Sequence, residues 1–533
     1  MLQISQLLLP VDHTPDTLRR EVMRTLKVKD TDLVSITLKQ RAIDARRGHV
    51  QFSLTVLVEV KNEPVVLARC APSSHVAPAP IETYQQIHGT IIHQPAKRPV
   101  IVGSGPCGLF CALLLARAGW KPILLERGKA AGDRARDVTG FWRRGWAFDP
   151  ESNVQFGEGG AGTFSDGKLY TQIRDREHRI PWLLKELVAA GAPEDILIKA
   201  RPHIGTDRLI KVVRHIREEI IALGGEVRFG ARVADCHIEG NTMRAVTLAD
   251  GEVIESSHLI FAIGHSSRDT FTMLHQRGVP FEAKSFSVGV RIEHPQKLID
   301  KILYGRWAGD ARLGSAPYKF VSHCQNGRAA YSFCMCPGGL VVAASSEPGM
   351  VVTNGMSSYA REEANANSGF MVDVRPEDYQ SPDPLSGIDF QRQLERRAFV
   401  LGGSDYKAPA QLLGDFLAGK ASTSGGSVIP SYQPGVVWSD LRECLPEYII
   451  DTLQQSIAQI DRKLPGFAME EAILTGVETR SSAPVRIPRH PDTLECTTIQ
   501  HLYPAGEGAG YAGGIISAAA DGMKVAEAIL RRA

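Results

Sequence analysis

The chain has 533 residues, of which 43% are hydrophobic and 23% are charged, and its formal net charge is +2. This length suits two or three domains, and the balanced charge excludes a strongly basic protein and does not favour nucleic acid as a partner. Nine cysteines without regular spacing do not indicate a disulfide framework, so we expect a reducing compartment. The segment MLQISQLLLPVDHTPD has no basic flank or small-residue cleavage site, so we do not expect it to be a secretory signal. No apolar stretch reaches ~18 residues, so we expect a cytoplasmic protein with no membrane partner.

Residues 1–95 are expected to form a small α+β module. An apolar strand, QISQLLL, precedes a helix that begins at Pro15 with Thr14 as its N-cap. The helix has one apolar face, formed by Leu18, Val22 and Leu26. Two β-rich runs follow, at residues 33–38 and 50–60. The Pro-rich residues 71–80 are expected to be a linker to the next domain.

A strand, a glycine-rich turn, a helix and a second strand follow one another from residue 99. The buried strand Val100–Val102 runs into Gly103-Ser104-Gly105-Pro106-Cys107-Gly108, which matches G-x-G-x-x-G. A helix is expected to about Ala118, and the second strand ends at Glu126, which Arg127 follows. This combination is typical of a dinucleotide-binding site.

Each part of this segment has a physical task in holding a dinucleotide. Gly103 permits the tight turn, Gly105 lets the backbone approach a pyrophosphate, and Gly108 lets the helix lie close to the strand. The helix N-terminus presents free N–H groups and a positive dipole end to the phosphates. Glu126, twenty-three residues after Gly103, is placed to bond the ribose hydroxyls, and its charge would repel the extra phosphate of NADP.

The C-terminal segment resembles the second FAD motif of the glutathione-reductase-type flavoprotein superfamily. It reads as a strand, a glycine-rich turn, PAGEGAGYAGGI, and a helix to about Arg531. The resemblance implies that the dinucleotide is FAD and that Gly506 and Glu507 lie near its ribityl–phosphate region. It also implies that the helix start, at Gly514 and Ile515, points at the flavin pyrimidine. A partial positive charge there would stabilise the anionic reduced flavin.

A strand in the middle of the chain resembles the one that closes the FAD domain in the same superfamily. It has the sequence LIFAIG and ends in Ala262-Ile263-Gly264, after a β-rich segment at residues 226–254. The resemblance places Val233 or its neighbour against the adenine.

A second glycine-rich loop lies between these motifs, in VQFGEGGAGTFSDGKL, residues 154–169. Because Phe156 and Phe164 are interleaved with the glycines, simple solvent exposure is not favoured. We expect this loop to lie along the cofactor, with contacts from Gly160, Gly162 and Ser165.

The whole chain resembles a bacterial family of poorly characterised FAD-dependent dehydrogenases. The shared segments run from about residue 99 to 533 and are GSGPCGLF, FGEGGAGTFSDGKL, AIGHSSRDTF, SVGVRIEHPQ, FCMCPGG, ASSEPGMVVTNGMS, GVETRSSAPVRI and PAGEGAGYAGGI. The resemblance implies a bound FAD and a two-part flavoprotein, and it leaves the small-molecule substrate open.

The segment FCMCPGG places two thiols, Cys334 and Cys336, one residue apart before a turn. With Leu340–Ala344 after it, the pattern predicts a hairpin in which both thiols share one face of the strand. Their Cβ atoms would lie ~6.6 Å apart, beyond the ~3.5–4.5 Å of a disulfide, so a bond needs the strand to bend. The pair is either structural and buried, or it contributes a reactive thiol to the flavin cleft. Cys324 would be a third metal ligand, but without a C-x-x-C pair we expect no metal.

Two further cysteines, Cys107 and Cys111, lie four residues apart inside the dinucleotide helix. A helix N-terminus stabilises a thiolate, but Cys107 there would face the anionic pyrophosphate, so both are interpreted as small packing residues. Because the chain has one dinucleotide fingerprint, the flavin must be reduced by a substrate, a protein partner, or NADH or NADPH docking without its own domain.

Several polar residues in the shared segments are candidates for the chemistry. Arg480 could face substrate or flavin, or form an ion pair that bridges two domains. Arg291 and His294 could bind an anionic substrate or be ordinary strand-end residues, and His265 could lie near the cofactor or cap a helix. The candidate catalytic residues are Cys334, Cys336 and Arg480.

We therefore predict an α/β protein with a Rossmann-type FAD-binding domain built from two chain segments. The predicted parts are an N-terminal α+β module (1–95), the first FAD segment (96–280), an inserted α+β central domain (281–477) and the second FAD segment (478–533). The predicted activity is two-electron transfer through flavin N5 to or from an unidentified substrate.

Two alternative functions remain. One is a flavoprotein that acts on RNA, with the N-terminal module guiding the substrate through Arg41, Arg46 and Arg47. A solvated loop face is the favoured interpretation of these three arginines. The other alternative is a non-catalytic flavin-bound sensor.

Overall fold

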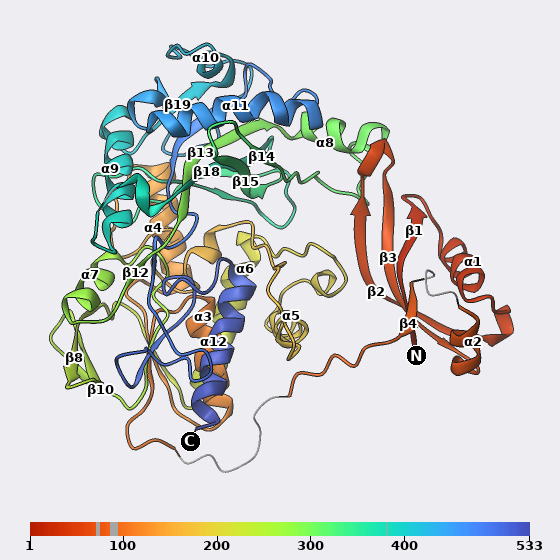
Figure 1. Cartoon of the computed structure of the whole chain (residues 1–533), viewed down its shortest axis with the longest axis horizontal. Helices are drawn as coiled ribbons and strands as arrows, with labels where there is room; N and C mark the ends of the chain where they lie inside the picture. Colours follow the sequence, from red (N-terminus) through yellow and green to blue (C-terminus); the bar gives the residue numbers. More distant parts are fainter. Residues whose placement is uncertain (71–74, 86–93, 380, 533) are drawn as a thin grey trace.

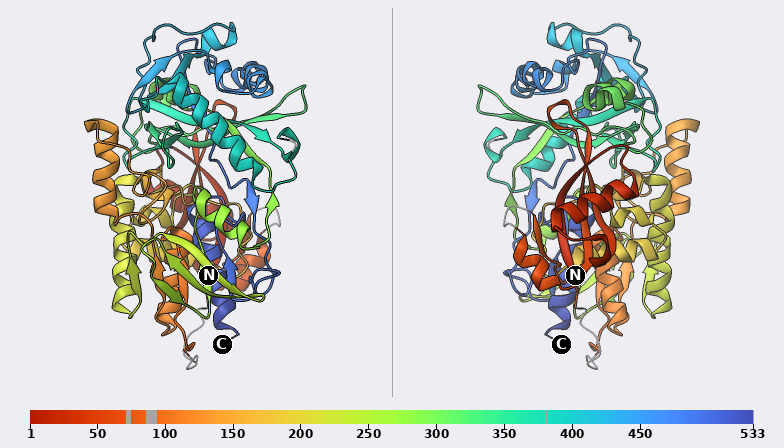
Figure 2. Two further views of the ribbon diagram at one scale, coloured as in Figure 1. Left: turned by 90° about the vertical axis from the view of Figure 1, so that its left-hand side faces the viewer. Right: turned by 90° about the vertical axis from the view of Figure 1, so that its right-hand side faces the viewer.

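The computed structural model describes residues 1–70, 75–85, 94–379 and 381–532. Three larger sheets organise the chain, namely a four-stranded sheet near the N-terminus, a five-stranded parallel sheet and a seven-stranded sheet. Figure 1 shows the N-terminal sheet on one side of the molecule and the seven-stranded sheet above the parallel sheet. The turned views in Figure 2 also show the seven-stranded sheet above the parallel sheet.

The N-terminal module consists of β1 (Leu2–Pro10), α1 (Pro15–Leu26), β2 (Leu33–Asp44), β3 (Gln51–Val60), α2 (Glu63–Arg69) and β4 (Val76–Pro78). The strand order is β2-β3-β1-β4 and every pair is antiparallel, which is the split βαβ arrangement of ferredoxin-like folds. The predicted cap of α1 is confirmed, because the Thr14 side chain accepts a hydrogen bond from the Thr17 amide and Pro15 opens the helix.

The Pro-rich stretch predicted to be a linker is partly a strand. Residues 76–78 pair with Leu2–Ile4 of β1, so this part of the linker prediction is wrong, and residues 71–74 lie outside the described chain. This pairing satisfies backbone hydrogen-bonding groups along the edge of β1, which a free linker would leave unpaired.

The basic cluster of the N-terminal module is partly engaged within the chain. Arg41 lies over the ring of Phe52, and its backbone amide donates to the carbonyl oxygen of Ile198. Arg46 forms an ion pair with Asp44 at 2.8 Å, and the Arg47 side chain lies outside the described residues. The interpretation of these arginines as an RNA-guiding surface therefore gains no support from their contacts.

The parallel sheet has the strand order β23-β11-β5-β6-β7 and draws its strands from distant parts of the chain. They are β5 (Val100–Val102), β6 (Ile123–Leu125), β7 (Glu226–Arg228), β11 (Leu259–Phe261) and β23 (Leu502–Pro504). Four of the five strands, β5, β6, β11 and β23, are continuous buried runs because both faces of the sheet are covered.

Two helices of this region, α3 (Pro106–Arg117) and α12 (Ile515–Leu530), pack directly against each other. A Cβ added to Gly522 of α12 would lie 2.0 Å from the carbonyl oxygen of Cys107, so this glycine lets the two backbones cross closely. The remaining elements of the region are α4 (Ala131–Arg144), α5 (Arg179–Ala189), α6 (Thr206–Ala222), α7 (Arg268–Gln276), β8 (Val233–Glu239), β9 (Thr242–Leu248), β10 (Val253–Glu255), β12 (Glu282–Ala283) and β22 (Val485–Arg486).

The seven-stranded sheet has the order β14-β15-β18-β13-β21-β19-β20. Its strands are β13 (Phe286–Pro295), β14 (Val321–His323), β15 (Ala329–Cys336), β18 (Asn365–Val374), β19 (Ala408–Leu412), β20 (Val436–Trp438) and β21 (Ile473–Glu478). The accompanying elements are α8 (Gln296–Tyr304), α9 (Ser386–Leu401), α10 (Leu413–Leu417), α11 (Glu447–Lys463), β16 (Leu340–Ala343) and β17 (Thr353–Met356).

The predicted hairpin at FCMCPGG is wrong. β15 pairs with β14 and β18, whereas β16 pairs with β17 in a separate two-stranded sheet. Between them, the amide of Gly339 donates to the carbonyl oxygen of Asn365, and a Cβ on Gly338 would lie 1.8 Å from the carbonyl oxygen of Arg361. The turn is thus held against the 361–365 segment, which carries the chain from one sheet to the other.

Among the described residues, no helix combines the length and apolar character needed to cross a bilayer.

Candidate cofactor and active site

A cavity of about 560 Å³ lies at the carboxyl ends of the parallel strands β5, β6 and β11, beneath the seven-stranded sheet. One part of its wall comes from the glycine-rich turns around Gly105, Gly160 and Gly513. The opposite part comes from the seven-stranded sheet and its surroundings, with Lys319, Phe333, Cys334, Cys336, Asn354 and Arg480. Ligands of open parallel sheets bind at this end of the strands.

The first glycine-rich turn has the geometry that close approach to a pyrophosphate requires. Gly103 has φ +104°, and a Cβ there would lie 2.4 Å from the carbonyl oxygen of Ala262. A Cβ on Gly108 would lie 1.9 Å from the Gly103 oxygen, whereas one on Gly105 would enter the cavity, with Gly160 Cα at 3.9 Å as its nearest neighbour. No side chain among the described residues caps the start of α3, so its first amides are available to an anion.

Glu126 lines the cavity at the end of β6, and its carboxylate orders the surrounding loops. One oxygen accepts hydrogen bonds from the amide (3.0 Å) and hydroxyl (2.8 Å) of Ser104, and the other accepts from the amides of Gly128 and Gly157, both at 2.9 Å. The predicted contact with the ribose stays a prediction, and any such contact shares the carboxylate with these donors.

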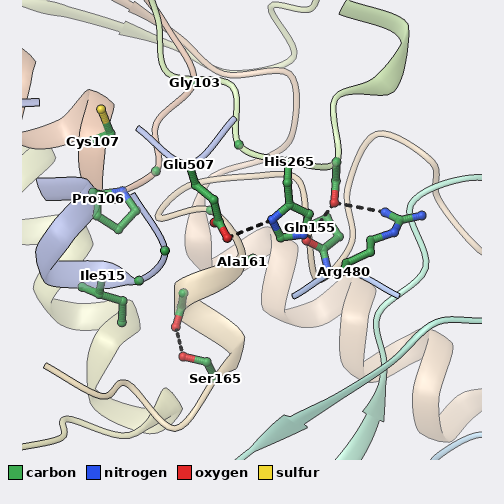
Figure 3. A pocket seen from close by; sticks show the side chains of 18 of the residues that line it. Gly103, Pro106, Cys107, Gln155, Ala161, Ser165, His265, Arg480, Glu507 and Ile515 are labelled. Atoms are coloured by element: carbon green, nitrogen blue, oxygen red, sulfur yellow. Dashed lines mark hydrogen bonds and ion pairs between the residues drawn. The ribbon is translucent and has the colours of Figure 1, made fainter. Parts of the chain in front are cut away.

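The C-terminal turn contributes Glu507 to the cavity wall, together with Gly514 and Ile515 at the start of α12. Glu507 Oε1 lies 3.3 Å from Nδ1 of His265, which also lines the cavity (Figure 3). Gly506 sits behind the wall, where its amide donates to Asp521 at 2.8 Å. As at α3, none of the described side chains caps the first turn of α12.

The second glycine-rich loop joins the other two. A Cβ on Gly160 would lie 3.1 Å from the α-carbon of Gly105, and one on Gly162 would lie 3.1 Å from the Ile515 side chain. Ser165 donates to the carbonyl oxygen of Gly162 at 2.7 Å, which tightens the loop (Figure 3). The three motifs, at residues 103–108, 154–169 and 506–515, therefore meet in one cavity wall.

Arg134 of α4 holds this loop, and sequence reasoning missed it. The side chain is fully buried and donates to the backbone carbonyl oxygens of Asn153, Val154, Gly157, Glu158 and Gly160. Burial lowers the pKa of Arg134 to about 10, which leaves it charged at neutral pH. The available signal was an arginine on the apolar face of an amphipathic helix.

The predicted cofactor residues fall into two groups by position. Most line the cavity, namely Gly103, Gly105, Pro106, Cys107, Glu126, Arg127, Gly160, Gly162, Ser165, Val233, Ala262, Gly264, Glu507, Gly514 and Ile515. Ser104, Gly108 and Gly506 are set behind the described wall. The wall fits a long, anionic dinucleotide such as FAD for two reasons. Two helix N-termini are uncapped, and glycines stand where a side chain would intrude on the cavity or its turns.

The two thiols of FCMCPGG face this cavity from the seven-stranded sheet. The ladder between β15 and β18 shifts between Phe333 and Cys336, and Cys334 adopts a left-handed conformation with φ +42°. The regular strand predicted here is therefore interrupted by a bulge. The left-handed conformation of Cys334 costs about 1–2 kcal/mol, because the residue has a Cβ. Cys334 is exposed to the cavity, and Cys336 is buried with its sulfur 3.2 Å from the Cys334 carbonyl oxygen and 4.0 Å from Nζ of Lys168.

Arg291 supports the bulge from behind the wall. Its Nη1 donates to the carbonyl oxygen of Cys334 at 3.0 Å, and its Nε lies 2.6 Å from Oε2 of Glu478. Burial raises the pKa of Glu478 to about 7, although Arg291 acts in the opposite direction. His294, on the same strand, is fully buried against the carbonyl oxygen of Phe467 at 2.7 Å and has a structural environment.

A charged cluster that the sequence did not single out lies next to Cys336. Asp166 contacts Lys168 at 3.0 Å and accepts a bidentate hydrogen bond from Arg361 at 2.9 and 2.6 Å. Burial alone would raise the pKa of Asp166, but the two cations outweigh it and hold that pKa well below its ordinary range. Asp166 and Lys168 line the cavity, so the cluster brings one carboxylate and two cations to the thiols.

Arg480 both bridges the two layers and lines the cavity. Its guanidinium contacts Glu395 of α9 at 2.9 Å and donates to the Ser266 hydroxyl at 3.0 Å (Figure 3). Glu395 also binds Arg268 at 2.7 Å, so two arginines share one buried carboxylate. Arg480 therefore both forms the predicted ion pair between the two layers and faces the cavity.

Cys107, Cys111 and Cys324 are packed within the protein, and Cys107 also lines the cavity. Burial raises the pKa of both Cys107 and Cys111, which keeps these thiols protonated between α3 and α12. Cys324 donates to the carbonyl oxygen of Thr452 at 3.5 Å. Within the described ranges, no group of three or more His, Cys, Asp or Glu side chains is arranged to hold a metal ion.

Comparison with known proteins gives two family matches. Residues 285–481 match the family described as "FAD-dependent protein, C-terminal domain-like", and residues 1–59 match a domain of unknown function. An uncharacterized protein from Clostridium beijerinckii is 46% identical over 537 aligned positions, which cover 100% of this chain and 99% of the relative.

More distant similarity extends to named enzymes. The 6-hydroxy-3-succinoylpyridine 3-monooxygenase of Pseudomonas putida is 26% identical over 222 residues, which are 39% of this chain and 51% of that protein. The solved structure of L-proline dehydrogenase from P. horikoshii has a TM-score of 0.34 and 12% identity, covering 83% of this chain and 95% of that one. A TM-score this low has no bearing on the activity of the present chain.

Proposed function

Because the chain belongs to the family of FAD-dependent proteins that includes the Clostridium beijerinckii relative, we propose that it is an oxidoreductase. In this proposal it transfers two electrons between FAD and a small molecule bound beneath the seven-stranded sheet. The supporting observation is that one cavity is lined both by the glycine-rich turns of the parallel sheet and by Cys334, Cys336 and Arg480 from the opposite wall.

The glycine-rich wall would hold the cofactor. The free amides at the start of α3 lie where a pyrophosphate can accept their hydrogen bonds, and Gly105 keeps that approach open. The start of α12, at Gly514 and Ile515, presents a second positive dipole end to the cavity. When bound, FAD supplies reversible two-electron transfer.

The opposite wall would bind the substrate. Phe333 offers an apolar surface, and Lys168 presents its ammonium group beside the thiols. Because Arg361 also neutralises Asp166, this end of the cavity carries more positive than negative charge. Arg480, fixed by Glu395, holds a guanidinium at the boundary between the two walls.

The electron donor belongs to the same proposal. Among the described residues, only the turn at 103–108 is followed by a helix and a second strand that ends in an acid, Glu126. A reduced nicotinamide would therefore have to enter through the substrate side. NADH, NADPH and oxidisable small molecules are therefore the donors to compare.

Anaerobic mixing of the FAD-loaded protein with each donor tests the proposal. We expect at least one donor to bleach the oxidised flavin absorbance, and Lys168→Met to slow that reduction while leaving the bound FAD content unchanged. Lys524→Met, at a position on α12 outside the described wall, is the matched control and should behave as the wild type. A purified protein that neither contains nor takes up FAD would overturn the proposal.

A further inference from the structure

We propose that Cys334 and Cys336 form a second redox centre, which cycles between a dithiol and an intramolecular disulfide and exchanges two electrons with bound FAD. The inference rests on the proposed function, because FAD is the electron acceptor and donor for the pair. It assigns both thiols of FCMCPGG to one reaction, in place of a single reactive thiol or two packing residues.

The positions of Cys334 and Cys336 support their assignment as a redox pair. Both residues are free thiols and both line the cavity, while the intervening Met335 is buried away from it. Cys334 is exposed to the cavity and Cys336 is buried beneath it. An accessible thiol followed by a protected one is the arrangement expected of an attacking and a resolving cysteine.

The backbone supplies the bend that a disulfide between these positions requires. On a regular strand the two Cβ atoms would stand ~6.6 Å apart, against the ~3.5–4.5 Å that a disulfide needs. Here two residues of β15, Cys334 and Met335, lie opposite the single residue Ser368 of β18, so the strand is bulged at the first thiol. Cys334 adopts a left-handed conformation at this bulge, and the Cys336 sulfur lies 3.2 Å from the Cys334 carbonyl oxygen.

Two positively charged side chains lie close enough to assist the chemistry. Nζ of Lys168 lies 4.0 Å from the Cys336 sulfur, and Arg291 holds the carbonyl oxygen of Cys334. A thiolate formed at either sulfur would be stabilised by these charges. Arg291 has a further task, because its hydrogen bond to the Cys334 carbonyl oxygen fixes the bulge at the first thiol.

The step balances without any further reactant. Two S–H bonds break and one S–S bond forms, and the two electrons and two protons released are taken up by oxidised FAD. In the opposite direction reduced FAD returns two electrons and two protons and the disulfide opens. A thiol–disulfide couple of this kind exchanges two electrons, the same number as the flavin.

The charges around the pair set its pH dependence. The enclosing protein raises the pKa of Cys334 to about 12 and also raises the pKa of Cys336, against the opposite effect of Lys168 and Arg291. The other charged groups facing the pair are Asp166, Arg361 and Glu478. Both thiols are therefore protonated at neutral pH, and disulfide formation should accelerate as the pH rises from 7 towards 10.

Reductive titration of the FAD-loaded protein tests the centre. Air-oxidised wild type, titrated anaerobically with dithionite, should take up four electrons per FAD, and Cys334→Ser and Cys336→Ser should each take up two. Cys444→Ser, in a fully buried site of the central core, is the matched control and should take up four. A wild type that takes up two electrons per FAD would overturn the inference and leave the proposed function standing.

Thiol mapping of the unaltered wild type provides a second readout that needs neither variants nor activity. After oxidation, denaturation and alkylation, the peptide that carries Cys334 and Cys336 should be unlabelled and two hydrogens lighter than the reduced peptide. Full alkylation of both cysteines in the oxidised protein would overturn the inference. If the protein takes up no FAD, the proposed function fails instead, and the same mapping after treatment with the thiol oxidant diamide decides whether the pair can close.

Discussion

The guanidinium of Arg291 holds the carbonyl oxygen of Cys334, donating across 3.0 Å from one strand to its neighbour but one in the seven-stranded sheet. The same guanidinium is paired with Glu478, and both side chains are buried. A bidentate, planar donor can serve both partners at once, which a lysine ammonium cannot. The shape of the cavity wall at the thiols therefore depends on an arginine that does not itself reach the cavity.

Replacing Arg291 with lysine should measure this contribution. Arg291→Lys keeps the charge and loses the hydrogen bonds to Cys334, so we expect the free energy of unfolding to fall by about 1.5–3 kcal/mol. Arg312→Lys is the control, because Arg312 forms an exposed pair with Asp310 and should change stability by less than about 1 kcal/mol. Equal effects of the two substitutions in chemical denaturation would contradict the role given to Arg291.

Glu478 should make stability depend on pH. Its pKa in the folded protein is raised to about 7, above the ordinary 4.5, so the folded state binds more protons than the unfolded state between these values. This contribution is fully present below pH 4.5 and is lost as the pH rises through 7, by about 3 kcal/mol in total. Glu478→Gln cannot titrate, so its stability relative to the wild type should improve between pH 5 and pH 8. A difference that stays constant over this range would contradict the raised pKa, because the folded and unfolded states would then bind the same number of protons at Glu478.

Gly105 should be required for the cofactor and dispensable for the fold. A Cβ at this position would project into the cavity without a close contact in the protein. Gly105→Ala should therefore weaken FAD binding by about tenfold or more, which corresponds to about 1.4 kcal/mol. The thermal midpoint of the apoprotein should be unchanged.

Gly132→Ala is the matched control for this experiment. Gly132 lies in α4, has no atom within 4 Å of an added Cβ, and is not part of the described cavity wall. Its FAD affinity, measured by fluorescence titration, should equal that of the wild type. An unaltered affinity in Gly105→Ala would mean that the phosphates lie elsewhere.

Arg268 and Arg480 allow structural and functional roles to be separated. Both bind the buried carboxylate of Glu395, but only Arg480 belongs to the described cavity wall. Replacing either with methionine should cost a similar amount of stability, on the order of 3–5 kcal/mol, because each breaks a buried ion pair. Only Arg480→Met should change the rate of anaerobic flavin reduction. If Arg268→Met slows reduction equally, Arg480 acts solely as part of the ion-pair network.

The parts of the cofactor site that the sequence revealed are those whose chemistry permits few residue types. A pyrophosphate approached by backbone requires glycine, so Gly103 and Gly105 are recognisable in the chain. A strand buried on both faces requires a continuous apolar run, as in Val100–Val102. These local requirements appear in adjacent residues, and the structure places the predicted turns in one cavity.

The parts that were missed depend on partners far away in the chain. FCMCPGG reads locally as a strand and a turn, but its strand pairs with residues 367–372, and that pairing introduces the bulge at Cys334. Likewise, Arg361 meets Asp166 and Arg134 meets a loop of carbonyl oxygens only after the sheets have assembled. Buried charges of this kind have no sequence pattern, because their partners are set by tertiary packing.

The cofactor cavity also has a consequence for how the protein is made. Gly103 and Gly514 both line it, yet one belongs to the first glycine-rich turn and the other to the last helix of the chain. During synthesis from the N-terminus, β11 waits for its neighbour β23, and α3 waits for α12, until residues 502–530 have been made. A nascent chain that stops short of α12 would expose the apolar side of α3, so the cofactor site can form only after α12 has been synthesised.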